Sequence, residues 1–95
     1  MGGYIYMMSD RYRGGIYTGV TAQLAGRIEQ HKTGKGSRFV ARYEFTRLVY
    51  IEVFEDISDA IVREKRLKKW RRAWKIELIE AMNPEWRDLS AEIHE

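Results

Sequence analysis

The sequence predicts an α+β fold in which a small three-stranded antiparallel sheet is flanked by helices, in the order β-β-α-β-α-α. Two short runs of strand-forming residues, at 4–8 and 16–20, are separated by a polar loop that ends in Gly14-Gly15. A third and stronger run covers 46–55. Apolar residues at helical spacing follow the second and third runs. Because three strands cannot close a barrel, the helices must pack on the sheet.

Composition limits the kind of protein this is. The 95 residues are the size of one domain, 1–95, and the hydrophobic and charged contents of 44% and 33% are typical of a globular chain rather than a disordered one. No apolar run is long enough to span a bilayer, and no signal peptide is recognisable. The absence of cysteine excludes disulfides and cysteine-ligated zinc. We therefore expect a cytoplasmic protein with no membrane partner.

The first two strands are predicted to form an antiparallel hairpin. Alternation along the first strand places Tyr4, Tyr6 and Met8 on one face, and Tyr17 and Gly19 share one face of the second strand. The tyrosines are either cross-strand packing partners or members of an active site. Gly19 either marks a bulge or strand end, or it leaves room for a ligand or a backbone to approach closely.

Helix and strand signals continue along the chain in order. Thr21 is a plausible N-cap for a helix over 22–32, which the sequence "TGKGS" at 33–37 interrupts. A short turn is expected from there through Tyr43. The run at 46–55 has the strongest strand signal and is predicted to be the central strand of the sheet.

Two helices are expected in the last third of the chain. Asp56 or Ser58 opens the first of them, which runs to about Trp70. The second covers about 72–82 and is bent from the first. Asn83, which precedes a proline, stops it, and a short tail turn follows.

One carboxylate is predicted among apolar positions of the first of these helices. At about 100° per residue, Glu64 lies between Ile57 and Leu67 in the apolar stripe. An unpaired buried carboxylate costs roughly several kcal/mol, so it must be paired, protonated or bound to a cation. A structural ion pair with an arginine and a functional carboxylate are equally open.

The helix over 22–32 carries two polar residues at the edge of its apolar stripe. Arg27 and His31 are one turn apart and flank Leu24 and Ile28, so both are expected to point into a shared cleft. The simpler alternatives are an ion pair between Arg27 and Glu64 and an ordinary amphipathic-edge role for His31.

Basic residues are concentrated in one segment. Residues 63–75 contain eight bases and one acid, a net charge of +7, within a chain of net charge +3. Such a block on an otherwise acidic chain is the electrostatic footprint of a polyanion site, although a solvated helix face is the alternative. The residues expected to contact nucleic acid are Lys65, Lys68, Lys69, Arg71 and Arg72, together with Lys35 and Arg38 from the glycine-rich loop.

Taken in order, these residues resemble the GIY-YIG nucleases. The pattern is formed by Tyr4-Ile5-Tyr6, Tyr17-Thr18-Gly19, Arg27, His31, Glu64 and Asn83. It covers essentially the whole chain, which is similar to a small stand-alone bacterial group of that superfamily. Tyr4 and Thr18 depart from the Gly and Ile of the two triplets at scaffold positions. The resemblance implies the GIY-YIG endonuclease fold. Because it covers essentially the whole chain, we expect no room for an added DNA-binding domain.

The resemblance also implies a chemistry. The chain would be a DNA endonuclease that hydrolyses phosphodiester bonds with one divalent ion, Mg²⁺ or Mn²⁺, bound by Glu64. Arg27 would neutralise the scissile phosphate, and His31 would hydrogen-bond the phosphate or a tyrosine hydroxyl. Tyr17 is favoured as the general base with Tyr6 as its positioning partner, and the reverse stays open.

Several alternatives remain at this level. Asn83 would either close the site or cap a helix, and these two roles are equally weighted. The substrate would be damaged or branched DNA in repair, with RNA and a substrate-delivering protein partner left open. The competing functions are a catalytically weak or inactive nucleic-acid-binding module of the same fold, and a structural or interaction protein, monomer or homodimer.

Overall fold

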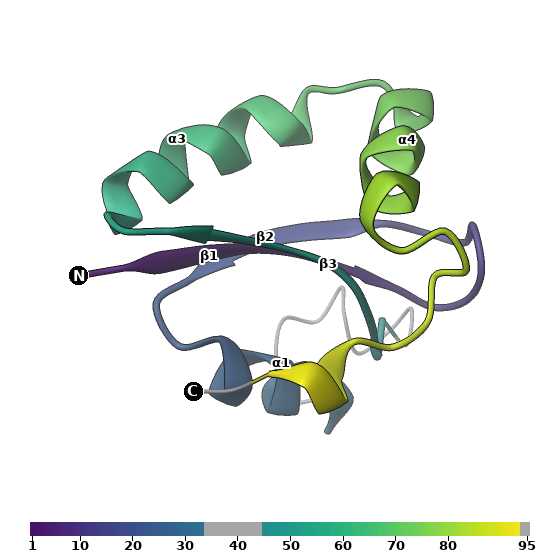
Figure 1. The fold of residues 1–95 in the computed structure, drawn as a ribbon, viewed down its shortest axis with the longest axis horizontal. Coiled ribbons are helices and arrows are strands. Elements are labelled where there is room, and N and C mark those ends of the chain that lie inside the picture. Colours follow the sequence, from purple (N-terminus) through teal and green to yellow (C-terminus); the bar gives the residue numbers. More distant parts are fainter. Residues whose placement is uncertain (34–44, 94–95) are drawn as a thin grey trace.

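The computed structural model describes residues 1–33 and 45–93 and confirms the α+β architecture. Figure 1 shows α3 and α4 over one face of the sheet, and α1 and the C-terminal tail on the other face. Within the described ranges, no helix is both long and apolar enough to cross a membrane. The elements are β1 (Gly3–Ser9), β2 (Tyr17–Thr21), α1 (Leu24–Lys32), β3 (Arg47–Phe54), α3 (Ile57–Lys68), α4 (Arg72–Met82) and a short 3-10 helix, η1 (Ser90–Glu92).

The strand order is β2-β1-β3, with both neighbouring pairs antiparallel. The prediction that the strand at 46–55 is central was therefore wrong, because β1 is central and β3 is an edge strand. The four consecutive apolar residues Ile5 to Met8 of β1 are fully buried, as a central strand requires. At the far end of β3, Val53 is 74% exposed.

The C-terminal segment covers the first half of the β3 edge, which explains why this edge strand is so apolar. The backbone N–H of Leu89 donates to the Leu48 carbonyl at 2.7 Å, and the Leu48 N–H donates to the Asp88 carboxylate at 3.2 Å. The Asn83 side-chain amide donates to the Val49 carbonyl at 3.1 Å. These bonds satisfy edge groups that would otherwise lie open to another strand.

Each face of the sheet has its own core. The predicted alternation of β1 is confirmed, since its even-numbered residues face α1 and its odd-numbered residues face α3 and α4. The α1-facing core contains Tyr6, Met8, Leu24, Ile28, Phe45, Leu48 and Leu89. The core below α3 and α4 contains Ile5, Met7, Val49, Tyr50, Leu67, Ile79 and Trp86.

The helix boundaries follow local capping chemistry, with one difference from the prediction. Asp56 caps α3 by accepting from the Ser58 N–H at 2.9 Å, as expected. α1 begins at Leu24, later than predicted, because Thr21 is still paired in β2. The Thr21 hydroxyl accepts from the Gln23 N–H at 3.0 Å in a local turn and does not cap the helix. The turn expected through Tyr43 lies outside the described residues.

A polar clamp holds the β1–β2 loop against α4. The Arg72 guanidinium donates to the carbonyls of Arg13 and Gly14 at 2.6 and 2.7 Å. Arg13, whose φ of 51° lies in the left-handed region, donates twice to Glu80 at 2.7 Å. The indole N–H of buried Trp86 donates to the same carboxylate at 2.7 Å. The hydrogen bonds from Arg13 and Trp86 lower the pKa of Glu80 to about 2.

This clamp predicts a pH-dependent stability. A carboxyl whose folded pKa is depressed stabilises the fold above its unfolded pKa, and that contribution is lost as pH falls toward the folded value of about 2. Glu80→Gln should therefore lower the melting temperature at pH 7, and the gap to wild type should shrink between about pH 4 and pH 2. Thermal unfolding followed by circular dichroism measures this.

The matched control is Glu92→Gln, since Glu92 is half-exposed and pairs with exposed Arg87. It should change the melting temperature little at any pH. Equal melting temperatures for Glu80→Gln and wild type at pH 7 would contradict the clamp.

Candidate active site

Three aromatic rings meet on the α1 side of the sheet. Tyr6 of β1 is fully buried, and its hydroxyl oxygen lies 3.0 Å from Nε2 of His31, which is 3% exposed. The ring centroid of Tyr17 lies 6.2 Å from that of Tyr6 and 5.1 Å from that of His31. The structure thus brings together three of the predicted site residues, from β1, β2 and α1.

Gly19 makes this cluster sterically feasible. It lies opposite Tyr6 in the β1–β2 pairing. A Cβ atom at residue 19 would stand 2.5 Å from both Cζ and Oη of Tyr6, a separation that real Cβ atoms do not show. The space that the sequence suggested for a ligand is therefore filled by the phenol of Tyr6, and the glycine is required for Tyr6 to reach His31.

The buried pair is electrically neutral near pH 7. Burial raises the pKa of Tyr6, and Tyr17 adds to the rise while the guanidinium of Arg27 opposes it. Burial, followed by the positive charge of Arg27, lowers the pKa of His31 to about 4. His31 Nδ1 is buried and makes no hydrogen bond within the part of the chain that the structure describes.

Tyr17 and Arg27 form the accessible side of the cluster. Tyr17 is half-buried, whereas Tyr6 is fully buried, so Tyr17 is the tyrosine that water can reach. Arg27 is half-buried on α1 and lines a surface hollow of about 370 Å³ together with Thr21 and Gln30. A guanidinium in an open hollow suits an anionic group of a ligand.

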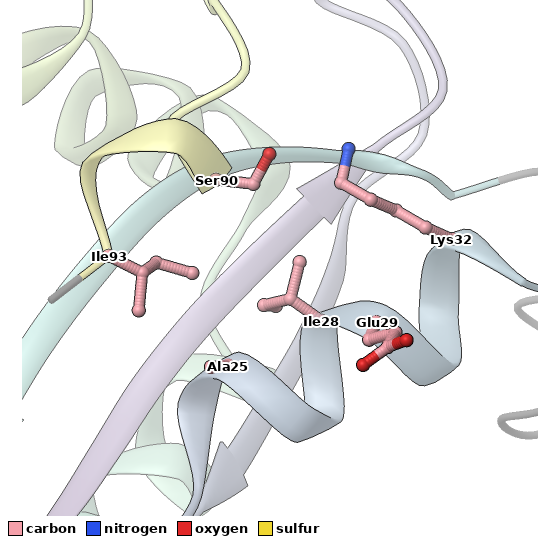
Figure 2. A pocket seen from close by; sticks show the side chains of 6 residues that line it. All are labelled: Ala25, Ile28, Glu29, Lys32, Ser90 and Ile93. Carbon is pink, nitrogen blue, oxygen red and sulfur yellow. The ribbon is translucent and has the colours of Figure 1, made fainter. Parts of the chain in front are cut away.

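A separate hollow of about 320 Å³ lies between α1 and the C-terminal tail (Figure 2). Ile28 and Ile93 line it from either side. The Lys32 ammonium at its rim donates to the Asp88 carboxylate at 2.6 Å and to the Thr46 carbonyl at 3.0 Å. Because its rim lysine is committed to these two partners, this hollow offers less to an anion than the Arg27 hollow does.

Glu64 approaches from the other face of the sheet. On α3, Arg63 donates two hydrogen bonds to Glu52 of β3, at 3.1 and 3.0 Å. Glu64 is the next residue, about 100° further round the helix from Arg63, and α3 also packs against β2. Its side chain is 15% exposed and, within the described ranges, pairs with the Lys68 ammonium at 3.4 Å and not with an arginine. Because α3 and α1 lie on opposite faces of the sheet, Glu64 and the ring cluster are on opposite sides of it.

The residues on this flank fit a hard divalent cation better than zinc. Among the residues described, no group of three or more His, Asp or Glu side chains could hold a metal. An ion here would rest on the Glu64 carboxylate, with water and substrate oxygens as further ligands, which Mg²⁺ and Mn²⁺ tolerate. The Thr18 hydroxyl, on the α3-facing side of β2, is buried without a hydrogen-bond partner in the described chain and is a second oxygen on that side. Sequence reasoning had treated Thr18 as a scaffold position.

Asn83 lies outside the ring cluster. It is the C-cap residue of α4 and is 2% exposed. Its amide nitrogen donates to the Val49 and Arg87 carbonyls at 3.1 and 2.8 Å, and its amide oxygen accepts from the Arg87 N–H at 3.1 Å. With both amide groups bonded inside the protein, this geometry favours the helix-cap role.

The basic segment divides into residues that serve the fold and residues that face solvent. Arg72 is part of the loop clamp, and Lys68 pairs with Glu64. The side chain of Arg71 lies over the Trp74 ring, 4.4 Å from its centroid. Lys65 and Lys69 are exposed. The predicted contacts Lys35 and Arg38 fall outside the described residues.

Comparison with known proteins finds similar sequences and a similar structure. The family described as the GIY-YIG catalytic domain matches residues 2–77. A UPF0213 protein of Syntrophus aciditrophicus is 34% identical over 85 residues, covering 86% of this chain and 93% of that protein. A UPF0213 protein of Staphylococcus aureus is 36% identical over 76 residues, covering 80% and 89%. The solution NMR structure of a UPF0213 protein from Bacillus halodurans is 26% identical, covers 93% of each chain and has a TM-score of 0.55.

The contact between residue 19 and Tyr6 predicts a specific cost. Gly19→Ala should lower the free energy of unfolding by about 1–3 kcal/mol, because the added methyl group must displace a fully buried ring. Gly26→Ala is the matched control, since a Cβ at residue 26 meets nothing within 4 Å and alanine favours helix. Urea unfolding of both variants measures the difference. A Gly19→Ala protein as stable as Gly26→Ala would show that residue 19 does not limit the position of Tyr6.

Proposed function

The chain belongs to the GIY-YIG catalytic domain family, and we propose that it is a metal-dependent nuclease that hydrolyses phosphodiester bonds in DNA. The observation that carries the proposal is the arrangement around strand β2. The Tyr6–Tyr17–His31 cluster is on one face with Arg27 beside it, and Glu64 is on α3, which packs against the same strand from the other face. A protein that only bound DNA would gain nothing from burying this set of polar groups.

Two charged residues would bind the reacting groups. Glu64 would hold Mg²⁺ or Mn²⁺, which when bound stabilises charge that develops on the leaving oxygen. Arg27 would bind the scissile phosphate through its planar guanidinium, a donor geometry that matches phosphate oxygens. In the protein as described, Lys68 neutralises Glu64 and would have to move aside for the ion.

The proton of the attacking water would go to Tyr17. Because burial raises the pKa of Tyr6, Tyr6 keeps its proton and serves as a hydrogen-bonding group. Tyr17 is partly exposed, so water can approach its hydroxyl. To accept that proton Tyr17 would have to react as the phenolate, a form that a neighbouring cation such as Arg27 would stabilise. Tyr6 and His31 would then orient the ring of Tyr17.

A second candidate is a DNA-binding module that does not cut. The Glu64–Lys68 ion pair favours it, since a carboxylate already neutralised by lysine needs no metal. We further propose a cytoplasmic location and a role on branched or damaged DNA. Cleavage of a branched substrate in preference to duplex would support that role.

The test is a cleavage assay with Glu64→Gln. We expect a loss of about a hundredfold or more in cleavage rate, because the substitution removes the charged ligand of the ion. DNA affinity measured without metal should stay within about twofold of wild type, since Glu64 contributes no phosphate contact. The substrates are single-stranded, duplex, nicked and branched DNA and one RNA, with Mg²⁺ or Mn²⁺.

Two controls make the result specific. EDTA should abolish cleavage by the wild type. The Glu85→Gln variant, in which an exposed glutamate is altered, should still cleave. A Glu64→Gln protein that cleaves as fast as wild type would overturn the assignment of Glu64. A wild type that binds all substrates and cleaves none would favour the second candidate.

A further inference from the structure

A hollow at the corner between α3 and α4 has no place in the proposed hydrolysis. It has a volume of about 430 Å³ and is lined by Trp70, Trp74, Glu77 and Leu78. Trp74 is 44% exposed, although tryptophan is usually among the more buried residue types. Trp86, by contrast, is fully buried and belongs to the core. The two corner tryptophans are therefore the ones available to a ligand.

The rings at this corner are held in a fixed arrangement. Trp70 and Trp74 meet edge to face, with centroids 6.1 Å apart and an angle of 89° between the ring planes. The Arg63 guanidinium lies 5.2 Å from the Trp70 centroid. Arg63 is in turn held by its two hydrogen bonds to Glu52, which also accepts from the Tyr50 hydroxyl. An aromatic surface that is ordered before binding loses little conformational entropy when a ligand stacks on it.

The charges around the hollow are mostly positive. Arg71 lies over Trp74, and the exposed residues Lys65 and Lys69 precede the corner on the chain. Burial and the nearby charge of Lys68 lower the pKa of Lys75, as expected where cations are crowded. A polyanion is the kind of ligand that such a rim attracts.

Inside the hollow the chemistry changes. Its floor is aromatic and aliphatic, and its one charged lining residue is the carboxylate of Glu77. A carboxylate repels phosphate but accepts hydrogen bonds from the N–H groups of a nucleobase. The rim thus suits phosphates, and the interior suits a neutral, planar, hydrogen-bonding ring.

We propose that this hollow binds an unpaired nucleobase of single-stranded DNA, stacked on the face of Trp74 opposite Arg71, with the adjoining phosphates on Arg71 and Lys69. Every base has a π-face, so such a site is tolerant of sequence, and bases in a duplex are already stacked on their neighbours. This inference rests on the proposed function, because it takes DNA as the ligand. It extends that function by making a strand with unpaired bases, rather than plain duplex, the preferred substrate.

The experiment measures affinity in EDTA, so it needs no cleavage. Fluorescence anisotropy of a short labelled oligothymidylate and of a duplex of equal length is compared for wild type and Trp74→Ala. We expect the affinity for the single strand to fall by about fivefold or more, and the affinity for duplex to stay within about twofold. The salt dependence should not change, because the phosphate contacts are intact. An abasic oligonucleotide should bind wild type as weakly as oligothymidylate binds Trp74→Ala.

Two variants are the matched controls. Trp74→Phe keeps an aromatic face and should retain most of the single-strand affinity, and Met82→Ala shortens another exposed apolar residue of α4 and should retain all of it. Equal single-strand affinity for Trp74→Ala and wild type would overturn the proposal, as would an equal loss for single strand and duplex. A change in self-association by Trp74→Ala with single-strand affinity unchanged would assign the hollow to a protein partner instead. If the wild type binds single strands but never cleaves them, the proposed nuclease activity is contradicted and the proposed nucleobase site is not.

Discussion

The site depends on one steric fit, that of the Tyr6 ring into the space left by Gly19. The two residues are paired across β1 and β2, and a Cβ at residue 19 would overlap the phenol. Because the ring can lie there, its hydroxyl reaches His31 on α1, and the ring of Tyr17 packs against both. One contact thus sets the distance between the two strands and the helix that carries Arg27, whose charge acts on both Tyr6 and His31.

A second consequence concerns the sheet itself. The central strand, β1, is paired on both sides, and the C-terminal tail covers part of the β3 edge. β2 is therefore the edge strand at which groups from both faces of the sheet can approach one ligand. The tyrosine cluster lies on the α1 side of that strand, and α3, which carries Glu64, packs on its other side. Because the sheet is one strand thick, a phosphate bound at the β2 edge can contact groups on both faces. In the proposed function, this arrangement would keep the base, Tyr17, and the metal ligand, Glu64, on opposite sides of one substrate phosphate.

Local patterns predicted the strands, the Asp56 cap and the α4 boundaries, because each depends on residues within a few positions of one another. Features that depend on distant residues were missed. β3 is an apolar edge strand because the distant residue Leu89 covers its edge, and alternation within the strand does not contain that information. Arg72 was counted with the DNA-facing bases, yet its guanidinium bonds to loop carbonyls near Gly14. The glycine at residue 19 indicated that space is needed there, but the sequence did not reveal that the Tyr6 ring fills that space.

The convergence of both faces on β2 is the central claim, and Mn²⁺-induced relaxation of backbone amide resonances tests it most directly. With substoichiometric Mn²⁺, the largest relaxation rates should occur together at Glu64 and at Thr18 and Gly19, and Glu64→Gln should remove the effect at both. This readout depends on distance from the ion and not on turnover. Large rates around Glu64 without any at β2, or largest rates elsewhere in the protein, would contradict the account.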